Sequence, residues 1–163
     1  MQQTEDGPLY SASDLLNFLG CRHATFLDLI DLETPLPRAV DDPQLRLLQE
    51  KGFEHERAHL QRLIEQGKRI IEISAHEDLQ QRIDLTNAAM KTGADVIYQA
   101  VLYRLPWRGY ADFLCRVEQP SNFGAHRYEV VDTKLARSPS ARYALQLCMY
   151  TDLLASTQGV MPA

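Results

Sequence analysis

The amino-acid sequence predicts an α/β domain in which a central mixed β-sheet is flanked by helices and preceded by a small helical unit. Apolar residues recur at helical spacing in several segments before residue 92, which indicates helices. Between residues 95 and 135 the apolar residues alternate instead, which is typical of strands, and a further helical segment follows. With 163 residues, of which 45% are hydrophobic, the chain can form one sizeable core.

The first part of the chain, residues 8–43, is expected to form the N-terminal helical unit. Ser11 and Asp14 are typical helix-start residues ahead of an apolar run at 15–19, and a second run with helical spacing covers 24–32. Prolines then interrupt an acidic link, at Pro35, Pro37 and Pro43. We therefore expect the main part of the domain to begin at residue 44.

The main part, residues 44–156, is expected to contain a long helix, the sheet and a last helix. The long helix covers 44–66 and ends before Gly67, and a short strand at 69–73 and a helix at 77–91 follow it. Three strands then form a meander at 96–103, 107–117 and 127–135. The last helix starts at 138 and ends near 155.

Three ionisable residues interrupt the apolar face of the long helix. At 100° per residue, His55, Glu56 and His59 lie on the arc that carries most of its apolar side chains. The other members of that arc are Leu45, Leu48, Gly52, Leu60 and Leu63. The spelling His-Glu-x-x-His is that of the helical zinc site in metallopeptidases. A core histidine with a satisfied hydrogen bond, or an ion pair at the helix edge, is the structural alternative.

Two predicted strands carry charged residues among apolar neighbours. Asp112 lies in the middle of the strand at 107–117, and Asp132 and Lys134 share one face of the strand at 127–135. A buried ion pair would explain Asp132 and Lys134, whereas a bound metal ion would also explain Asp112 and the histidines. Two carboxylates and a histidine suit Mg²⁺ or Mn²⁺, and a lysine beside them suits metal-assisted hydrolysis of phosphodiester bonds.

Four short segments, in this order, resemble the motifs of a known family. They are GFEHE at 52–56, GYAD at 109–112, VDTK at 131–134 and QLCMY at 146–150. They resemble the RecB-type branch of the PD-(D/E)xK nuclease superfamily, and most of all the RecB-like nuclease domain at the N-terminus of larger predicted nucleases. The resemblance spans residues 10–154. It implies one nuclease domain over 1–163 with a restriction-endonuclease-like fold.

The resemblance also implies the metal ligands. His55, Asp112 and Asp132 would bind the divalent ion, Mg²⁺ or Mn²⁺, and the backbone carbonyl of Thr133 would complete the set. Glu56 is a further candidate ligand beside them. Asp112 and Asp132 would thereby also count among the catalytic residues.

Further roles implied by the resemblance fall on the DTK segment and on the last helix. Lys134 would be the catalytic lysine, which orients the attacking water and offsets negative charge on the transition state. Gln146 and Tyr150 share one helix face and would point toward the site or the DNA strand. A helix face with a buried amide and tyrosine is the alternative. The family assigns no role to His59, so we expect it either in the core or in contact with the residues that form the site.

The implied function is that of a metal-dependent (exo)deoxyribonuclease acting on single strands or ends of DNA, in DNA repair, recombination or defence. The net charge of −5 does not favour nucleic acid, but residues 101–142 contain more basic than acidic residues. A zinc metallopeptidase is one alternative, with Glu72 or Glu77 as the third ligand it needs. The other is a catalytically silent DNA-binding module of nuclease fold.

The cysteines and the chain ends allow further expectations. Cys21, Cys115 and Cys148 form no Cys-x-x-Cys pair, so buried, reduced thiols are expected. Cys21 lies in a segment similar to the one that supplies the first cysteine of an iron–sulfur cluster in some relatives, but the other ligands would have to follow Ala163 in a longer chain, which could also carry a helicase-like domain. The absence of a signal peptide or apolar span predicts a cytoplasmic protein without membrane contact.

Overall fold

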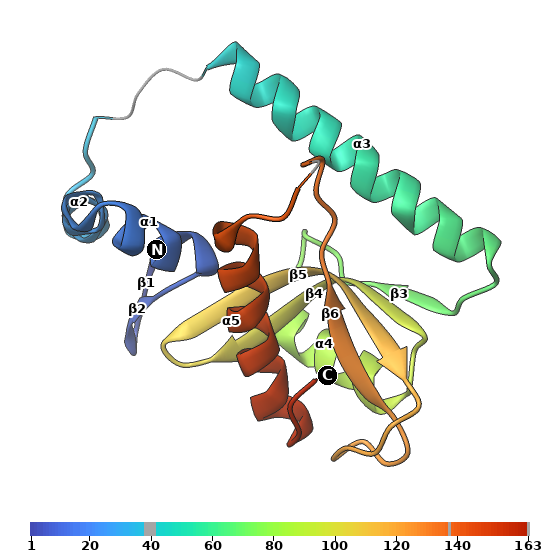
Figure 1. Ribbon diagram of the computed structural model, residues 1–163. Helices are drawn as coiled ribbons and strands as arrows, with labels where there is room; N and C mark the ends of the chain where they lie inside the picture. Colours follow the sequence, from blue (N-terminus) through green and yellow to red (C-terminus); the bar gives the residue numbers. More distant parts are fainter. Residues whose placement is uncertain (38–41, 137, 163) are drawn as a thin grey trace.

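The computed structural model describes residues 1–37, 42–136 and 138–162, which form six strands and five helices (Figure 1). In chain order these are β1 (Gln2–Thr4), β2 (Gly7–Leu9), α1 (Ala12–Gly20), α2 (Arg22–Glu33), α3 (Pro43–Glu65), β3 (Ile70–Glu72), α4 (Leu79–Lys91), β4 (Val96–Arg104), β5 (Trp107–Val117), β6 (Arg127–Val131) and α5 (Ala141–Gln158). The predicted α/β class is confirmed. Residues 38–41 of the predicted acidic link lie outside the described residues.

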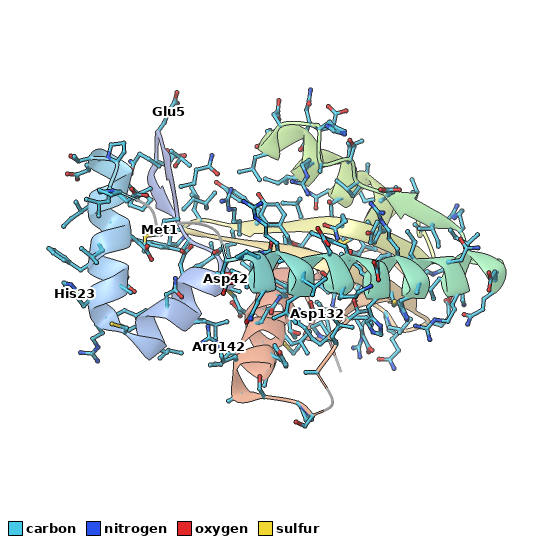
Figure 2. All side chains as sticks on the ribbon, turned by 90° about the horizontal axis from the view of Figure 1, so that it is seen from above. Met1, Glu5, His23, Asp42, Asp132 and Arg142 are labelled. Carbon is cyan, nitrogen blue, oxygen red and sulfur yellow. The ribbon has the colours of Figure 1, made fainter. Side chains whose placement is uncertain are left out.

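The main sheet has the strand order β3-β4-β5-β6, with β3 parallel to β4 and the other pairs antiparallel. It is therefore mixed, as predicted. Helices α4 and α5 lie on opposite faces of this sheet, and α3 runs across one end of it (Figures 1 and 2). The sheet is thus flanked by helices.

Two apolar clusters hold these layers together. The larger cluster joins the sheet to α4 and α5, through residues such as Met90, Leu114 and Leu153. The smaller one contains Val96, Tyr98 and Phe113 of the sheet, against which Leu60 and Leu63 of α3 pack. Burying such side chains contributes roughly 1.5–3 kcal/mol each. The second half of α3 is therefore anchored on the sheet.

The first half of α3 differs from the prediction. Leu45 and Leu48 were expected on the buried arc, yet Leu48 is 64% exposed and Leu45 and Phe53 are also exposed. Helical periodicity only says that these side chains share a face. In the structure the sheet ends before the first half of α3, so this face has no sheet beneath it (Figure 1).

The N-terminal unit contains the two predicted helices together with a small hairpin that was not predicted. Strands β1 and β2 pair antiparallel, and Tyr10 continues this segment onto the main sheet. The Tyr10 N–H donates to the Pro106 carbonyl at 2.8 Å, and the Arg108 N–H donates to the Tyr10 carbonyl at 2.8 Å. A capping box between Ser11 and Asp14 starts α1, as the sequence predicts.

The strand predicted at 127–135 is shorter in the structure, because β6 ends at Val131. The next amide of the ladder, the Thr133 N–H, donates to Oδ2 of Asp112 at 3.1 Å instead of to a backbone carbonyl. A side chain has thus replaced the strand partner. Asp132 and Lys134 therefore lie just beyond the strand, not within it.

The exposure of the cysteines differs in part from the prediction. Cys21 and Cys148 are exposed, so the expected burial is wrong for these two thiols, whereas Cys115 is partly buried. Burial raises the pKa of the Cys115 thiol. Among the described helices, none combines the length and the apolar character that crossing a membrane requires.

Candidate active-site groove

The candidate site is a groove of about 390 Å³ between α3, the middle of β5, the segment that follows β6 and the start of α5. Its lining residues are Leu48, Gln49, Gly52, Phe53, Glu56, Asp112, Thr133, Lys134, Leu135, Ala136 and Tyr143. Parts of three of the four motif segments thus meet here. Seen from above, Asp132 lies between α3 and α5 (Figure 2).

Asp112 is central to the groove. Its carboxylate accepts the Thr133 N–H and lies 3.4 Å from the Thr133 hydroxyl. Burial, together with the charge of Asp132, raises the pKa of Asp112 to about 7, and the charge of Glu56 adds to the effect. Three carboxylates therefore act on one another at this end of the sheet.

Asp132 and Lys134 form an ion pair with unequal exposure. Lys134 Nζ lies 2.7 Å from Oδ2 of Asp132, and the side chains are 32% and 2% exposed, respectively. Burial by itself lowers the pKa of Lys134, but the hydrogen bond and charge of Asp132 outweigh it, so the pKa is raised and the amine stays protonated. The other oxygen of Asp132, Oδ1, is buried and has no hydrogen-bond partner among the described residues.

Helix α3 contributes Glu56 to the groove, whereas its two histidines are not among the lining residues. Glu56 is 7% exposed and accepts a hydrogen bond from the side-chain amide of Gln99. His55 is half-buried and does not line the groove. Within the described ranges, no group of three His, Cys, Asp or Glu side chains is arranged to hold a metal ion. The proximity of His55 to the two aspartates stays a prediction.

His59 has a packing position, as expected. Its ring lies against the edge of Phe113, with ring centroids 4.9 Å apart. Burial lowers the pKa of His59, and the charges of Arg62 and His55 lower it further. The imidazole therefore favours its neutral form, in keeping with a residue that packs on an aromatic ring.

Gln146 and Tyr150 are joined to each other at the edge of the groove. The Gln146 amide donates to the Tyr150 hydroxyl at 3.3 Å, and burial raises the pKa of Tyr150. A Cβ on Gly109 would come within 2.6 Å of the Tyr150 ring, which explains why the GYAD segment has glycine there. Neither Gln146 nor Tyr150 is among the residues that line the groove, so the predicted helix face is present but its catalytic role stays a prediction.

Sequence reasoning did not find two residues of the site. Gln99 contacts Glu56, and Tyr143 lies with its ring 5.7 Å from Lys134 Nζ. The signal for Gln99 was present, because it is the one polar residue in the run VIYQAVLY of β4.

The basic residues of 101–142 are largely used in pairs, such as Arg116 with Glu118 at 2.9 Å.

Comparison with known proteins gives no further guide to the chemistry of this groove. No protein-family model, no curated protein and no solved structure matches the chain. Its function is therefore inferred from the residues of the groove and their contacts.

Proposed function

We propose that this protein is a divalent-metal-dependent nuclease of the RecB-like, PD-(D/E)xK type, which hydrolyses phosphodiester bonds of DNA in single strands or at ends. The observation that carries the proposal is Oδ1 of Asp132, a buried carboxylate oxygen without a hydrogen-bond partner in the described part of the chain. Buried polar atoms are almost always satisfied, so an unpaired one requires an explanation such as strain, a catalytic role or a bound water or ion. For a carboxylate oxygen beside a second carboxylate, a cation is the group that would also offset the negative charge.

Asp112 and Asp132 offer the type of oxygen ligand that suits Mg²⁺ or Mn²⁺. Both ions prefer hard oxygen ligands, and Mg²⁺ is often held by one or two carboxylates while water and substrate phosphate fill the other positions. Asp112 and Asp132 supply two such groups, and a cation between them would offset the repulsion that raises the pKa of Asp112. When bound, the ion would polarise the phosphate and lower the pKa of the attacking water.

We assign the contribution of α3 to Glu56, because this carboxylate lines the groove beside Asp112 and Lys134. Its charge already acts on Asp112, since it helps to raise the pKa of that residue. The ligands implied by the family resemblance at His55 and at the Thr133 carbonyl stay predictions.

Lys134 can serve the reaction from the rim of the groove. Asp132 holds the Lys134 amine through one ion pair. The side chain is about a third exposed and lines the groove, so the other N–H groups of the amine can donate to a molecule in the groove. A protonated amine there can orient a water molecule and stabilise the negative charge that develops on the phosphate oxygens. These are the two tasks that a catalytic lysine performs in phosphodiester hydrolysis.

The walls of the groove favour unpaired strands. Leu48 and Phe53 on α3 are largely exposed, and Tyr143 lies on the opposite side. Unstacked bases bind to apolar and aromatic side chains without regard to sequence, whereas a duplex keeps its bases stacked inside. A strand with free bases can therefore contact the walls while its phosphate approaches Lys134.

The zinc peptidase is less well supported. A zinc site would need both histidines and a third ligand around one ion. In the structure the His59 ring packs on Phe113, and Glu56 is held by Gln99. A silent DNA-binding module gives no reason for an unsatisfied Asp132 oxygen next to a protonated lysine.

Cleavage of end-labelled, single-stranded DNA tests the proposal. We expect cleavage with Mg²⁺ or Mn²⁺ and none with EDTA. Lys134→Ala should reduce the rate about 10³-fold, in line with the loss of one electrostatic group at a transition state, while Mn²⁺ binding measured by calorimetry persists. Lys91→Ala, an exposed lysine at the end of α4, is the control and should cleave like the wild type.

Other results would favour the other functions. Cleavage that survives both Lys134→Ala and Asp112→Ala would show that the nuclease assignment is wrong. Zinc-dependent peptide hydrolysis that disappears in His59→Ala would identify the peptidase. Metal-dependent DNA binding without any cleavage would identify the silent module.

A further inference from the structure

Gln99 has an unusual backbone for its place in the fold. It lies inside strand β4, yet its φ is 57°, and it is the one non-glycine residue with positive φ among those that the structure describes. Side chains other than Gly, Asn and Asp rarely adopt this conformation, which persists only where the surroundings enforce it. Strain of this kind is concentrated at functional sites.

The position of Gln99 relates it to the groove. On β4 and β5 the register pairs Tyr98 with Phe113 and Ala100 with Ala111, so Gln99 lies across from Asp112. On β5 and β6 Phe113 pairs with Val131, so Asp112 in turn lies across from Asp132. Gln99, Asp112 and Asp132 therefore lie side by side across three neighbouring strand segments. The backbone irregularity coincides with the level of the two aspartates.

The side chain of Gln99 reaches the third carboxylate of the groove. Its amide donates a hydrogen bond to Oε1 of Glu56, which is 7% exposed. The side chain of the neighbouring Tyr98 also interacts with Glu56, and burial together with the charge of this carboxylate raises the pKa of Tyr98 to about 12. The side chains of two adjacent residues of one strand are therefore directed to the same carboxylate. Adjacent side chains of a regular strand point to opposite faces, so both can reach one carboxylate only if the backbone turns between them.

We infer that Gln99 is a positioning residue whose left-handed backbone lets its amide fix the Glu56 carboxylate beside Asp112 as part of the metal site. The inference rests on the proposed function. A residue kept only for the strand would be better served by an extended conformation, and one kept only for the bend by glycine, which adopts positive φ without strain. Glutamine at this position is explained by its amide.

Gln99→Gly separates the backbone from the side chain, because glycine tolerates φ of 57° but has no amide. In the full chain, titrated with Mn²⁺ alone and without DNA, we expect Gln99→Gly to weaken binding by about tenfold, the smaller effect typical of removing a group that orients a ligand. The melting temperature of the metal-free protein should stay within a few degrees of the wild type. Gln99→Asn, which also tolerates positive φ but is one methylene shorter, should weaken binding similarly.

A double-mutant cycle distinguishes positioning from a general effect on the strand. If Gln99 acts through Glu56, then Gln99→Gly in the background of Glu56→Gln should cause no further loss of Mn²⁺ affinity, because the partner is already gone. Gln119→Gly, an exposed residue of the β5–β6 connection, is the matched control and should bind Mn²⁺ like the wild type.

The outcomes are distinguishable. Wild-type Mn²⁺ affinity in Gln99→Gly or Gln99→Asn, or additive losses in the cycle, would overturn the inference, and loss of binding in Asp112→Asn would leave the proposed function standing. If the wild type itself bound no Mn²⁺, both the inference and the metal site of the proposed function would fail.

Discussion

A set of hydrogen-bonded polar groups in the core and the carboxylates of the groove beneath α3 differ in how completely they are matched. In the core around α4, the Val101 N–H donates to the Thr86 hydroxyl at 3.0 Å, and His126 Nε2 lies 3.0 Å from the Met90 carbonyl. At the far end of α5, Gln158 accepts the Tyr128 N–H at 2.9 Å through Oε1 and donates to the Tyr128 carbonyl at 3.2 Å. These polar groups are matched, as packing alone requires.

In the groove the polar groups are concentrated and incompletely matched. Asp112, Asp132 and Glu56 carry like charges close to one another, and Oδ1 of Asp132 has no partner in the described residues. Both regions are built on the same strands, so poor packing of the whole sheet does not explain the difference. The contrast supports the proposal that a cation binds in the groove, because a cation has the charge that would offset these carboxylates.

Removing a hydrogen-bonded side chain from the core should have the largest effect on the free energy of unfolding. Gln158→Leu preserves the side-chain volume but leaves the N–H and carbonyl of Tyr128 without their partners. We expect the free energy of unfolding to fall by about 3 kcal/mol, since each unsatisfied group costs roughly 1–3 kcal/mol. Urea unfolding measures this loss, and Mn²⁺ affinity should not change. Gln119→Leu, on the exposed connection, should leave stability unaltered; an equal loss there would contradict the interpretation.

Neutralising Asp112 in the groove should instead raise the free energy of unfolding. Because burial and Asp132 raise the pKa of Asp112 from 3.8 to about 7, its ionisation is harder in the folded chain. The free energy of unfolding of the metal-free protein should therefore fall as pH rises from about 4 to about 7, and then level off. Asp112→Asn should remove this slope and be more stable at pH 8 by about 2 kcal/mol.

Urea unfolding in EDTA at several pH values checks this second effect. Asp84→Asn, an exposed residue of α4, is the matched control and should keep the wild-type slope. If Asp112→Asn unfolds with the same pH dependence as the wild type, the groove carboxylates are not destabilising. Adding Mn²⁺ to the wild type should also flatten the slope, because the ion offsets the repulsion.

The smallest effect concerns Gly52, which lines the groove from α3. A Cβ there would meet no atom within 4 Å, so Gly52→Ala should stabilise the helix by roughly 0.5–1 kcal/mol. The added methyl group narrows the groove, and we expect slower DNA cleavage with unchanged Mn²⁺ binding. Gly20→Ala in α1, which also has free space, should stabilise without any effect on cleavage. Equal cleavage rates in both variants would show that Gly52 does not limit access.

The order and type of the main elements were predicted well from the sequence, because buried apolar residues recur at different spacings in helices and in strands. In β5, period two requires neighbouring side chains to lie on opposite faces, and in the structure Gly109 faces Tyr150 whereas Tyr110 packs against Arg82 of α4. The hairpin of β1 and β2 was missed because its strands are short and polar, with Pro8 within them. Their stability depends on docking to the β4–β5 turn.

The ends and the exposures of elements were predicted less well. The alternation of Tyr128, Val130 and Asp132 continues smoothly past Val131, yet β6 stops there because the Asp112 side chain takes the next N–H. Burial of Cys21 and Cys148 was expected from residue type alone. Cys21 lies between α1 and α2 and Cys148 lies on α5, and both are exposed.

The sequence by itself singled out the candidate residues: aspartates and a lysine at strand positions, and ionisable residues on an apolar helix face, are costly unless they have a task. It could not say which of His55 and Glu56 lines the groove, because residues 100° apart both fall on a broad arc. Only the tertiary structure shows that Glu56 does, with α3 anchored on the sheet through Leu60 and Leu63. The same holds for Gln99, whose conformation depends on contacts with a helix 43 residues away in the chain.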